Sequence, residues 1–189
     1  MAVSLSAGVY NGDATFADQH RPASWKQPER AIMIAIKPHH FVDILTALGE
    51  GRAEFQPHAY GHALHGVAEV ILRDGNVLLR MELGADDICQ PCCHHVGGSC
   101  NDTIDTSFRP QAPSSKREWN LLIDRRWCER LGLAQDDRLT AREFCLRLRD
   151  DCGDIADIYR EIPPARVLER QAKLRKGISL FLAKSDPAQ

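Results

Sequence analysis

The chain of 189 residues lacks long apolar segments and has little aromatic surface. No stretch reaches the roughly 18 consecutive apolar residues that a membrane-spanning helix needs, so we expect no membrane association. Aromatic residues make up only 6% and the formal net charge is −2. Nucleic-acid binding is therefore not expected, because both stacking platforms and a basic field are missing. Residues 1–16 lack the basic segment and apolar core of a secretory signal, which favours the cytoplasm.

The common catalytic signatures are also missing. The sequence has no Walker loop, no dinucleotide-binding glycine motif and no Ser/His/Asp signature. Whether the protein is an enzyme is therefore left open. What the chain does contain is seven cysteines. In a reducing compartment an odd number of cysteines indicates metal ligands or core residues rather than a disulfide framework.

Apolar patterns predict an α+β fold. Residues 31–37 and 77–83 read as two short strands, and a helix that opens at Pro38 follows the first of them. Residues 58–72 predict a second helix. The expected architecture is a small two-strand nucleus with a metal-binding cysteine loop and a helical C-terminal half.

The C-terminal half predicts three helices. The first carries Trp119, Ile123, Trp127 and Leu131 at helical spacing. Thr140 and Glu143 form a capping-box pattern at the start of the next. Pro163-Pro164 opens the last, whose apolar stripe is Val167, Leu168, Leu174, Ile178 and Phe181. The expected regions are a loosely ordered N-terminal extension (1–30), a metal-binding α+β domain (31–160) and a C-terminal amphipathic helix (161–189).

Four cysteines and two histidines are concentrated between residues 89 and 100. Cys89 and Cys92 have the Cys-x-x-Cys spacing that lets one turn aim two thiolates at one metal. Gly97 and Gly98 allow the chain to fold back so that Cys100 can join them. Thiolates favour iron–sulfur clusters, zinc or copper(I). The other three cysteines lie on apolar helix positions and are expected in the core: Cys128, Cys145 and Cys152.

The segment KPHHFVDIL, a glycine-rich turn, DDICQPC and a later cysteine together resemble a known family over residues 34–148. It is a family of small prokaryotic proteins catalogued as domain of unknown function 1284. The resemblance implies two histidines, an early cysteine and three later cysteines around one centre, and Cys89, Cys92 and Cys100 match. The early cysteine position is occupied here by Asp43. Its carboxylate is one possible fourth ligand; Cys93, His94, His40 and an external ligand are the alternatives.

Histidines are the second group of candidates. His39 and His40 lie one helical turn before Asp43, on the same helix face, and can supply a ligand, a supporting hydrogen bond or a proton relay. His58, His62 and His65 would form one stripe of the second predicted helix. We interpret that stripe as the polar flank of an amphipathic helix rather than as a metal site.

The leading hypothesis is an iron–sulfur protein in electron transfer, in redox sensing or as an accessory to an enzyme, with a protein redox partner or that enzyme as partner. A zinc protein with a structural or interaction role is the first alternative. The second is an enzyme whose cluster, with one non-cysteine ligand, activates a small substrate. The sequence does not give the oligomeric state.

Overall fold

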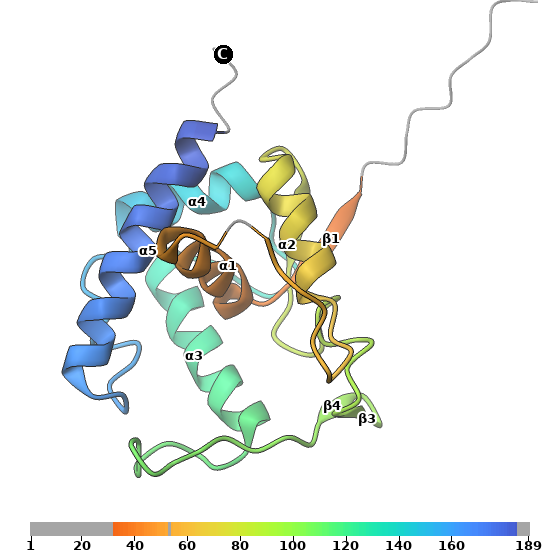
Figure 1. Ribbon diagram of the computed structural model, residues 1–189, viewed down its shortest axis with the longest axis vertical. Coiled ribbons are helices and arrows are strands. Elements are labelled where there is room, and N and C mark those ends of the chain that lie inside the picture. The colour runs from red at the N-terminus through yellow and green to blue at the C-terminus, as the bar shows by residue number, and fades with distance from the viewer. Residues whose placement is uncertain (1–31, 53, 185–189) are drawn as a thin grey trace, which may run out of the picture. The chain divides into compact units, whose positions relative to one another are not determined.

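The computed structural model describes residues 32–52 and 54–184 (Figure 1). The expected extension, residues 1–30, lies outside the described residues. The α+β prediction is confirmed, because the described residues form five helices, a three-stranded sheet and a two-stranded sheet. The elements in chain order are β1 (Met33–Ile36), α1 (Pro38–Glu50), α2 (Leu64–Arg73), β2 (Leu78–Met81), β3 (His95–Val96), β4 (Ser99–Cys100), α3 (Lys116–Leu131), β5 (Arg138–Thr140), α4 (Ala141–Asp151) and α5 (Pro164–Lys184).

The two expected strands are neighbours in the larger sheet. β1 pairs with β2 in parallel, with Ile36 opposite Met81. β2 also pairs with β5 in antiparallel orientation, with Leu79 opposite Leu139. The sheet therefore has three strands rather than two. β5 is only three residues long with one buried residue, Leu139, so it has no readable period of its own.

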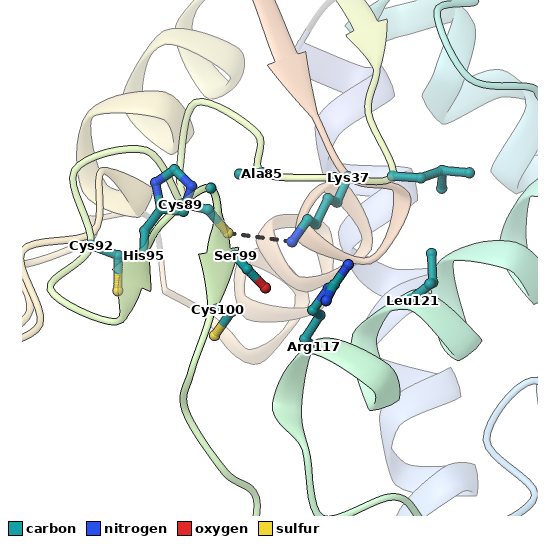
Figure 2. A pocket seen from close by; sticks show the side chains of 12 residues that line it. Lys37, Ala85, Cys89, Cys92, His95, Ser99, Cys100, Arg117 and Leu121 are labelled. Carbon is teal, nitrogen blue, oxygen red and sulfur yellow. Dashed lines mark hydrogen bonds between the residues drawn. The ribbon is translucent and has the colours of Figure 1, made fainter.

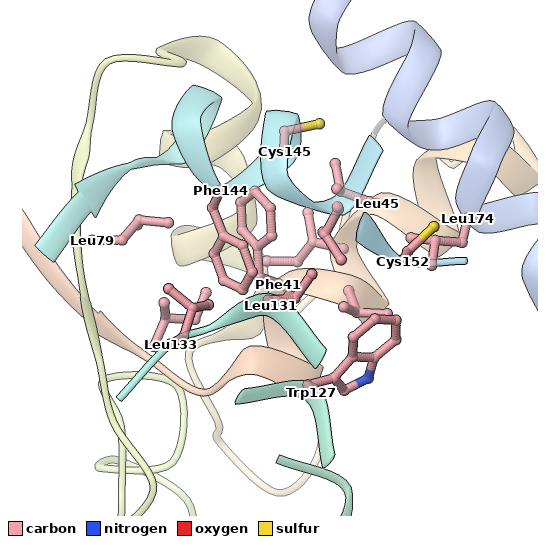
Figure 3. Packing of buried hydrophobic residues seen from close by; sticks show 14 of the residues in the cluster. Phe41, Leu45, Leu79, Trp127, Leu131, Leu133, Phe144, Cys145, Cys152 and Leu174 are labelled. Atoms are coloured by element: carbon pink, nitrogen blue, oxygen red, sulfur yellow. The ribbon is translucent and has the colours of Figure 1, made fainter. Parts of the chain in front are cut away.

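Helices α1 and α5 pack closely along one another (Figure 1). Gly49 and Gly177 meet at their crossing, where a Cβ on Gly177 would lie 1.8 Å from the Leu45 carbonyl oxygen. Next to this crossing the rings of Phe41 and Phe144 stack with centroids 4.4 Å apart (Figure 3). The core therefore joins α1 to both α4 and α5.

Most of the expected helix ends and apolar faces are confirmed. Thr140 accepts a hydrogen bond from the Glu143 backbone and its own backbone donates to the Glu143 side chain, which is the capping box. The apolar face of α3 is buried as expected. On α5 the stripe is confirmed except at Leu168, which is 66% exposed because it lies one residue beyond Val167 and thus on another face. The three cysteines assigned to the core are buried: Cys128, Cys145 and Cys152.

The second helix is shorter than predicted. It begins at Leu64 rather than near His58. Before it, the Gly61 backbone donates to the His58 carbonyl oxygen, and Gly61 has φ +68°. That left-handed residue ends the turn before a helix can start, so the three histidines at 58, 62 and 65 do not form one helical stripe. No helix among the described residues is long and apolar enough to cross a membrane.

Candidate metal centre

Two adjacent aspartates fix the start of the cysteine loop on strand β1. The Asp87 carboxylate accepts a hydrogen bond from the Ala35 backbone at 2.9 Å. Asp86 is fully buried, and its carboxylate accepts from the backbone N–H of Lys37 at 2.9 Å. The loop therefore begins at the junction of β1 and α1, next to His40.

Tight turns then bring the cysteines back to this junction. The Cys89 backbone donates to Asp86 and the Cys92 backbone donates to the Cys89 carbonyl, each at 3.0 Å. Gly97 and Gly98 have φ of +59° and +79°, the pattern of a two-residue hairpin turn that joins β3 to β4. This return places Cys100 opposite His95 and confirms the expected role of the two glycines.

Cys89, Cys92 and Cys100 line one cavity of about 170 Å³, which we call the thiol cavity. His40 and Asp43 from α1 line it as well. The same three cysteines also line a smaller cavity of about 120 Å³, where the Lys37 ammonium lies 3.4 Å from the Cys89 sulfur (Figure 2). The structure thus brings α1 and the cysteine loop together.

Cys93 is separated from the other loop cysteines. It is exposed and lines neither cavity. Its backbone N–H donates to the Tyr60 carbonyl oxygen at 2.8 Å, which ties the loop to the segment before α2. Of the adjacent pair, Cys92 is the residue that reaches the thiol cavity.

His40 is held in one orientation by Asp86. Its Nδ1 lies 2.6 Å from an Asp86 oxygen, so the ring has only Nε2 left as a free donor or ligand atom. Ligand atoms of His40, Asp86 and Cys89 lie within 4.8 Å of one another, the one such group of three or more among residues 32–52 and 54–184. Asp86 already accepts hydrogen bonds from Lys37, His40 and Cys89. We therefore assign Asp86 to the support of the ligands, in the manner of carboxylates behind metal-bound histidines.

The charge states of Asp86 and Cys89 follow from their burial and from these contacts. Burial alone would raise the pKa of Asp86, but His40 and the Lys37 backbone hold that pKa well below its usual range. Burial and the neighbouring Asp86 raise the pKa of the Cys89 thiol to about 12, against the opposing effect of Lys37. Without a bound cation this sulfur keeps its proton, whereas a metal ligand must be the thiolate.

His39 belongs to a different contact. Its Nδ1 lies 2.8 Å from an Asp124 oxygen, and its backbone N–H donates to the same carboxylate. Burial alone would lower the pKa of His39, but Asp124 outweighs this and holds the pKa above its usual value. His39 does not line the thiol cavity. The histidine pair is thus divided, with His40 facing the cysteines and His39 bound to α3.

Asp43 reaches the thiol cavity but its carboxylate has a partner. It forms an ion pair with Arg170 of α5. Burial alone would raise the pKa of Asp43, and Arg170 instead holds it below its usual value. A bound metal would have to compete with this guanidinium for the carboxylate oxygen.

The structure adds His62 to the candidate metal centre, although the sequence had been interpreted otherwise. His62 lines the thiol cavity, and its Nδ1 is buried without a hydrogen-bond partner. Its ring stacks on that of His58, with centroids 4.7 Å apart. The interpretation of this pair as a helix flank is wrong, because both residues precede α2. The only available signal was the four-residue spacing, which pointed to the wrong element.

The donor set fits a soft or borderline metal ion, since it combines three thiols with imidazole nitrogens. Of the three loop sulfur atoms, only that of Cys89 belongs to the donors that cluster within 4.8 Å. Four ligands of one tetrahedral zinc ion would lie about 3.8 Å apart, given Zn–S bonds of about 2.3 Å. No family model, curated protein or solved structure matches this chain.

Proposed function

We propose that the thiol cavity holds an iron–sulfur cluster, with Cys89, Cys92 and Cys100 as thiolate ligands and His40 as the fourth ligand. The observation that carries this proposal is that three loop thiols and a carboxylate-oriented imidazole line one cavity. A volume of about 170 Å³ also supports a group larger than a single ion, because a cavity of about 150 Å³ accommodates benzene. Clusters with histidine ligands beside cysteines are an established type.

The resemblance to the family catalogued as domain of unknown function 1284 supports three of these ligands, Cys89, Cys92 and Cys100. It predicts a cysteine at the position of Asp43, and that carboxylate lines the same cavity. Because Asp43 is bound to Arg170, we assign the fourth position to His40, whose Nε2 has no hydrogen-bond partner among the described residues.

A bound cluster would supply one-electron chemistry, with a potential set by its ligands and its exposure. The protein would then act in electron transfer or redox sensing, or as the accessory of an enzyme. A further role in activating a small substrate is favoured by a larger cavity that shares His40 and Asp43 with the thiol cavity. A centre with one non-cysteine ligand is suited to such chemistry.

Zinc is the second candidate, favoured by the group of His40, Asp86 and Cys89 within 4.8 Å. In that arrangement a single ion would sit between the imidazole and the thiolate. The three hydrogen bonds that Asp86 already accepts argue against a carboxylate ligand there. Cys92 and Cys100 would have to move towards the ion.

Iron, acid-labile sulfide and zinc measured on anaerobically purified protein test the proposal. A cluster gives a brown protein with absorbance near roughly 400 nm and iron matched by sulfide, whereas zinc gives a colourless protein. Cys92→Ser should lose most of the metal and Cys93→Ser should keep it, since of these two adjacent cysteines Cys92 alone lines the cavity. Equal metal content in both variants would refute the assignment.

The fourth ligand is tested by His40→Ala and Asp43→Ala compared in parallel. His40→Ala should change the spectrum and make the centre labile. Asp43→Ala should leave the spectrum unchanged, because its carboxylate binds Arg170. The reverse result would transfer the fourth position to Asp43.

A further inference from the structure

A cavity of about 400 Å³ lies next to the thiol cavity, between the start of α1, the N-terminal part of α3, α5 and the segment around residue 108. The two cavities share His40, Asp43, Lys116 and Asn120 as lining residues. We call the larger one the cationic cavity. Its volume falls within the usual range for small-molecule sites, about 300–1,000 Å³.

Two arginines in this cavity share one aromatic surface. The guanidinium carbons of Arg109 and Arg166 lie 4.9 Å and 4.2 Å from the centre of the Phe108 ring. Neither forms an ion pair among residues 32–52 and 54–184. The nearby Asp105 carboxylate accepts hydrogen bonds from the Ser107 backbone and hydroxyl, at 2.8 Å and 3.0 Å. The two positive charges therefore lie close together without a carboxylate bound to either.

The other cations of the cavity differ in this respect. Lys116 is bound to Asp102 at 2.7 Å, and Arg170 is paired with Asp43. Arg170 still has a buried Nε without a hydrogen-bond partner. Burial and the neighbouring Arg166 lower the pKa of Arg109, although Asp105 opposes this. The lining of the cavity therefore carries more cations than carboxylates, and Asp105 offsets only part of this positive charge.

The remaining lining is apolar and aromatic. Trp119 is 5% exposed, and the guanidinium of Arg109 lies 5.1 Å from the centre of its ring. Ile123 and Val167 are buried beside it, and Tyr159 lies below Arg170. A ligand in this cavity would meet both guanidinium groups and apolar or aromatic side chains.

We infer that the cationic cavity binds a small organic anion, in which a phosphate or carboxylate group meets Arg109 and Arg166 and an apolar body packs on Phe108 and Trp119. Guanidinium groups match both oxyanions through paired N–H donors. A bound oxyanion also removes the repulsion between the two arginines. This site does not depend on a bound cluster, because Arg109 and Arg166 do not line the thiol cavity.

Isothermal titration calorimetry of the full-length protein with phenyl phosphate and with benzoate tests the inference. Benzyl alcohol is the neutral control with the same apolar body. At least one anion should bind roughly tenfold or more tightly than the alcohol, and the tighter anion identifies the class of the natural ligand. Equal binding of all three compounds, or no binding of either anion, would overturn the inference.

Arg166→Gln and Arg109→Gln should each weaken binding of the tighter anion by about tenfold or more. Arg166 is exposed, so its replacement should not disturb folding. Arg125→Gln is the matched control, because it removes the same charge from an exposed position on α3 outside the cavity. If Arg125→Gln weakens binding as much as Arg166→Gln, the anion recognises net charge and the site is refuted.

Cys89→Ser separates this inference from the proposed cluster. It should lose metal and still bind the anion with the affinity of the parent protein. If it retains its metal while anion binding is intact, only the cluster proposal fails. If anion binding is lost together with the metal, the cavity is part of the metal centre and the independent site is wrong.

Discussion

Replacement of Asp86 by asparagine is the change that most directly tests how the site is built. The carboxylate is fully buried and accepts hydrogen bonds from the Lys37 backbone at 2.9 Å, His40 Nδ1 at 2.6 Å and the Cys89 backbone at 3.0 Å. An asparagine has nearly the same shape but only one acceptor oxygen. If that oxygen keeps the bond to Cys89, its amino group faces two N–H donors.

The magnitude follows from these three bonds. Hydrogen bonds to a charged group are worth about 1.5–3 kcal/mol each, and two of them are lost or reversed, so we expect destabilisation of about 3–6 kcal/mol. His40 can recover one bond by moving its proton to Nε2, so that Nδ1 accepts from the new amide. That tautomer has no free Nε2 lone pair for a metal, and we expect metal affinity to fall by roughly 10–100-fold.

Urea unfolding of the chelator-treated protein measures the loss of stability, and competition with a chelator measures the loss of metal affinity. Asp87→Asn is the control, since Asp87 is exposed and, among the described residues, its carboxylate accepts only from the Ala35 backbone, at 2.9 Å. It should cost about 1 kcal/mol at most and leave metal binding unchanged. An Asp86→Asn protein with the stability and metal affinity of the control would refute the role of Asp86.

Three further changes have separate expected outcomes. Cys100→Ser should remove most of the metal, measured by elemental analysis, because it takes one thiolate from the thiol cavity. Gly177→Ala should cost about 3 kcal/mol or more in urea unfolding, because its Cβ would lie 1.8 Å from the Leu45 carbonyl oxygen. Glu161→Gln should cost about 1–3 kcal/mol near neutral pH, because its carboxylate binds Arg126 through two hydrogen bonds of 2.7 Å and 2.8 Å. The hydrogen bonds from Arg126 hold the pKa of Glu161 below its usual value, so this stabilisation is complete above the unfolded-state pKa and is lost as pH falls through the folded-state pKa.

Each change has a control that isolates its cause. Cys145→Ser should retain the metal and lose stability, since Cys145 is buried in the core away from the loop (Figure 3). Gly66→Ala should be neutral or stabilising, because no atom lies within 4 Å of the added Cβ. For Glu161→Gln, a stability difference from the parent that stays constant down to about pH 3 would contradict the assignment to the ionised carboxylate.

Local patterns were sufficient to predict the parts of the fold that local chemistry determines. The Thr140 capping box and the Gly97-Gly98 return are each decided within a few residues, and both are confirmed. The short strand β5 could not be predicted in this way, because it exists only through its pairing with β2. The same holds for the start of α2, where the left-handed Gly61 overrides a helical apolar spacing.

The candidate site likewise contains residues that local sequence patterns predicted and residues that they did not. The cysteine spacing indicated three residues that do line one cavity, and the first helix was expected to face them. The role of Asp86 was hidden, because a buried carboxylate cannot be told from an exposed one by its neighbours in sequence. The cationic cavity could not be predicted from the sequence either, since Arg109 and Arg166 are far apart in the chain and come together at the Phe108 ring only in the folded structure.

The start of α1 explains why the site and the fold are built from the same groups. The N-cap residue Lys37 has no side-chain cap, so the first N–H groups of this helix need partners from elsewhere. Asp86 accepts from the Lys37 backbone and Asp124 accepts from the His39 backbone, 49 and 85 residues away in the chain. A negative charge is favourable at a helix N-terminus, so both carboxylates stabilise α1 while each also binds a histidine ring. Because each carboxylate serves both purposes, a mutation of Asp86 or Asp124 that releases His40 or His39 also removes a cap from α1. Variants of the two histidines themselves are therefore the cleaner probes of function.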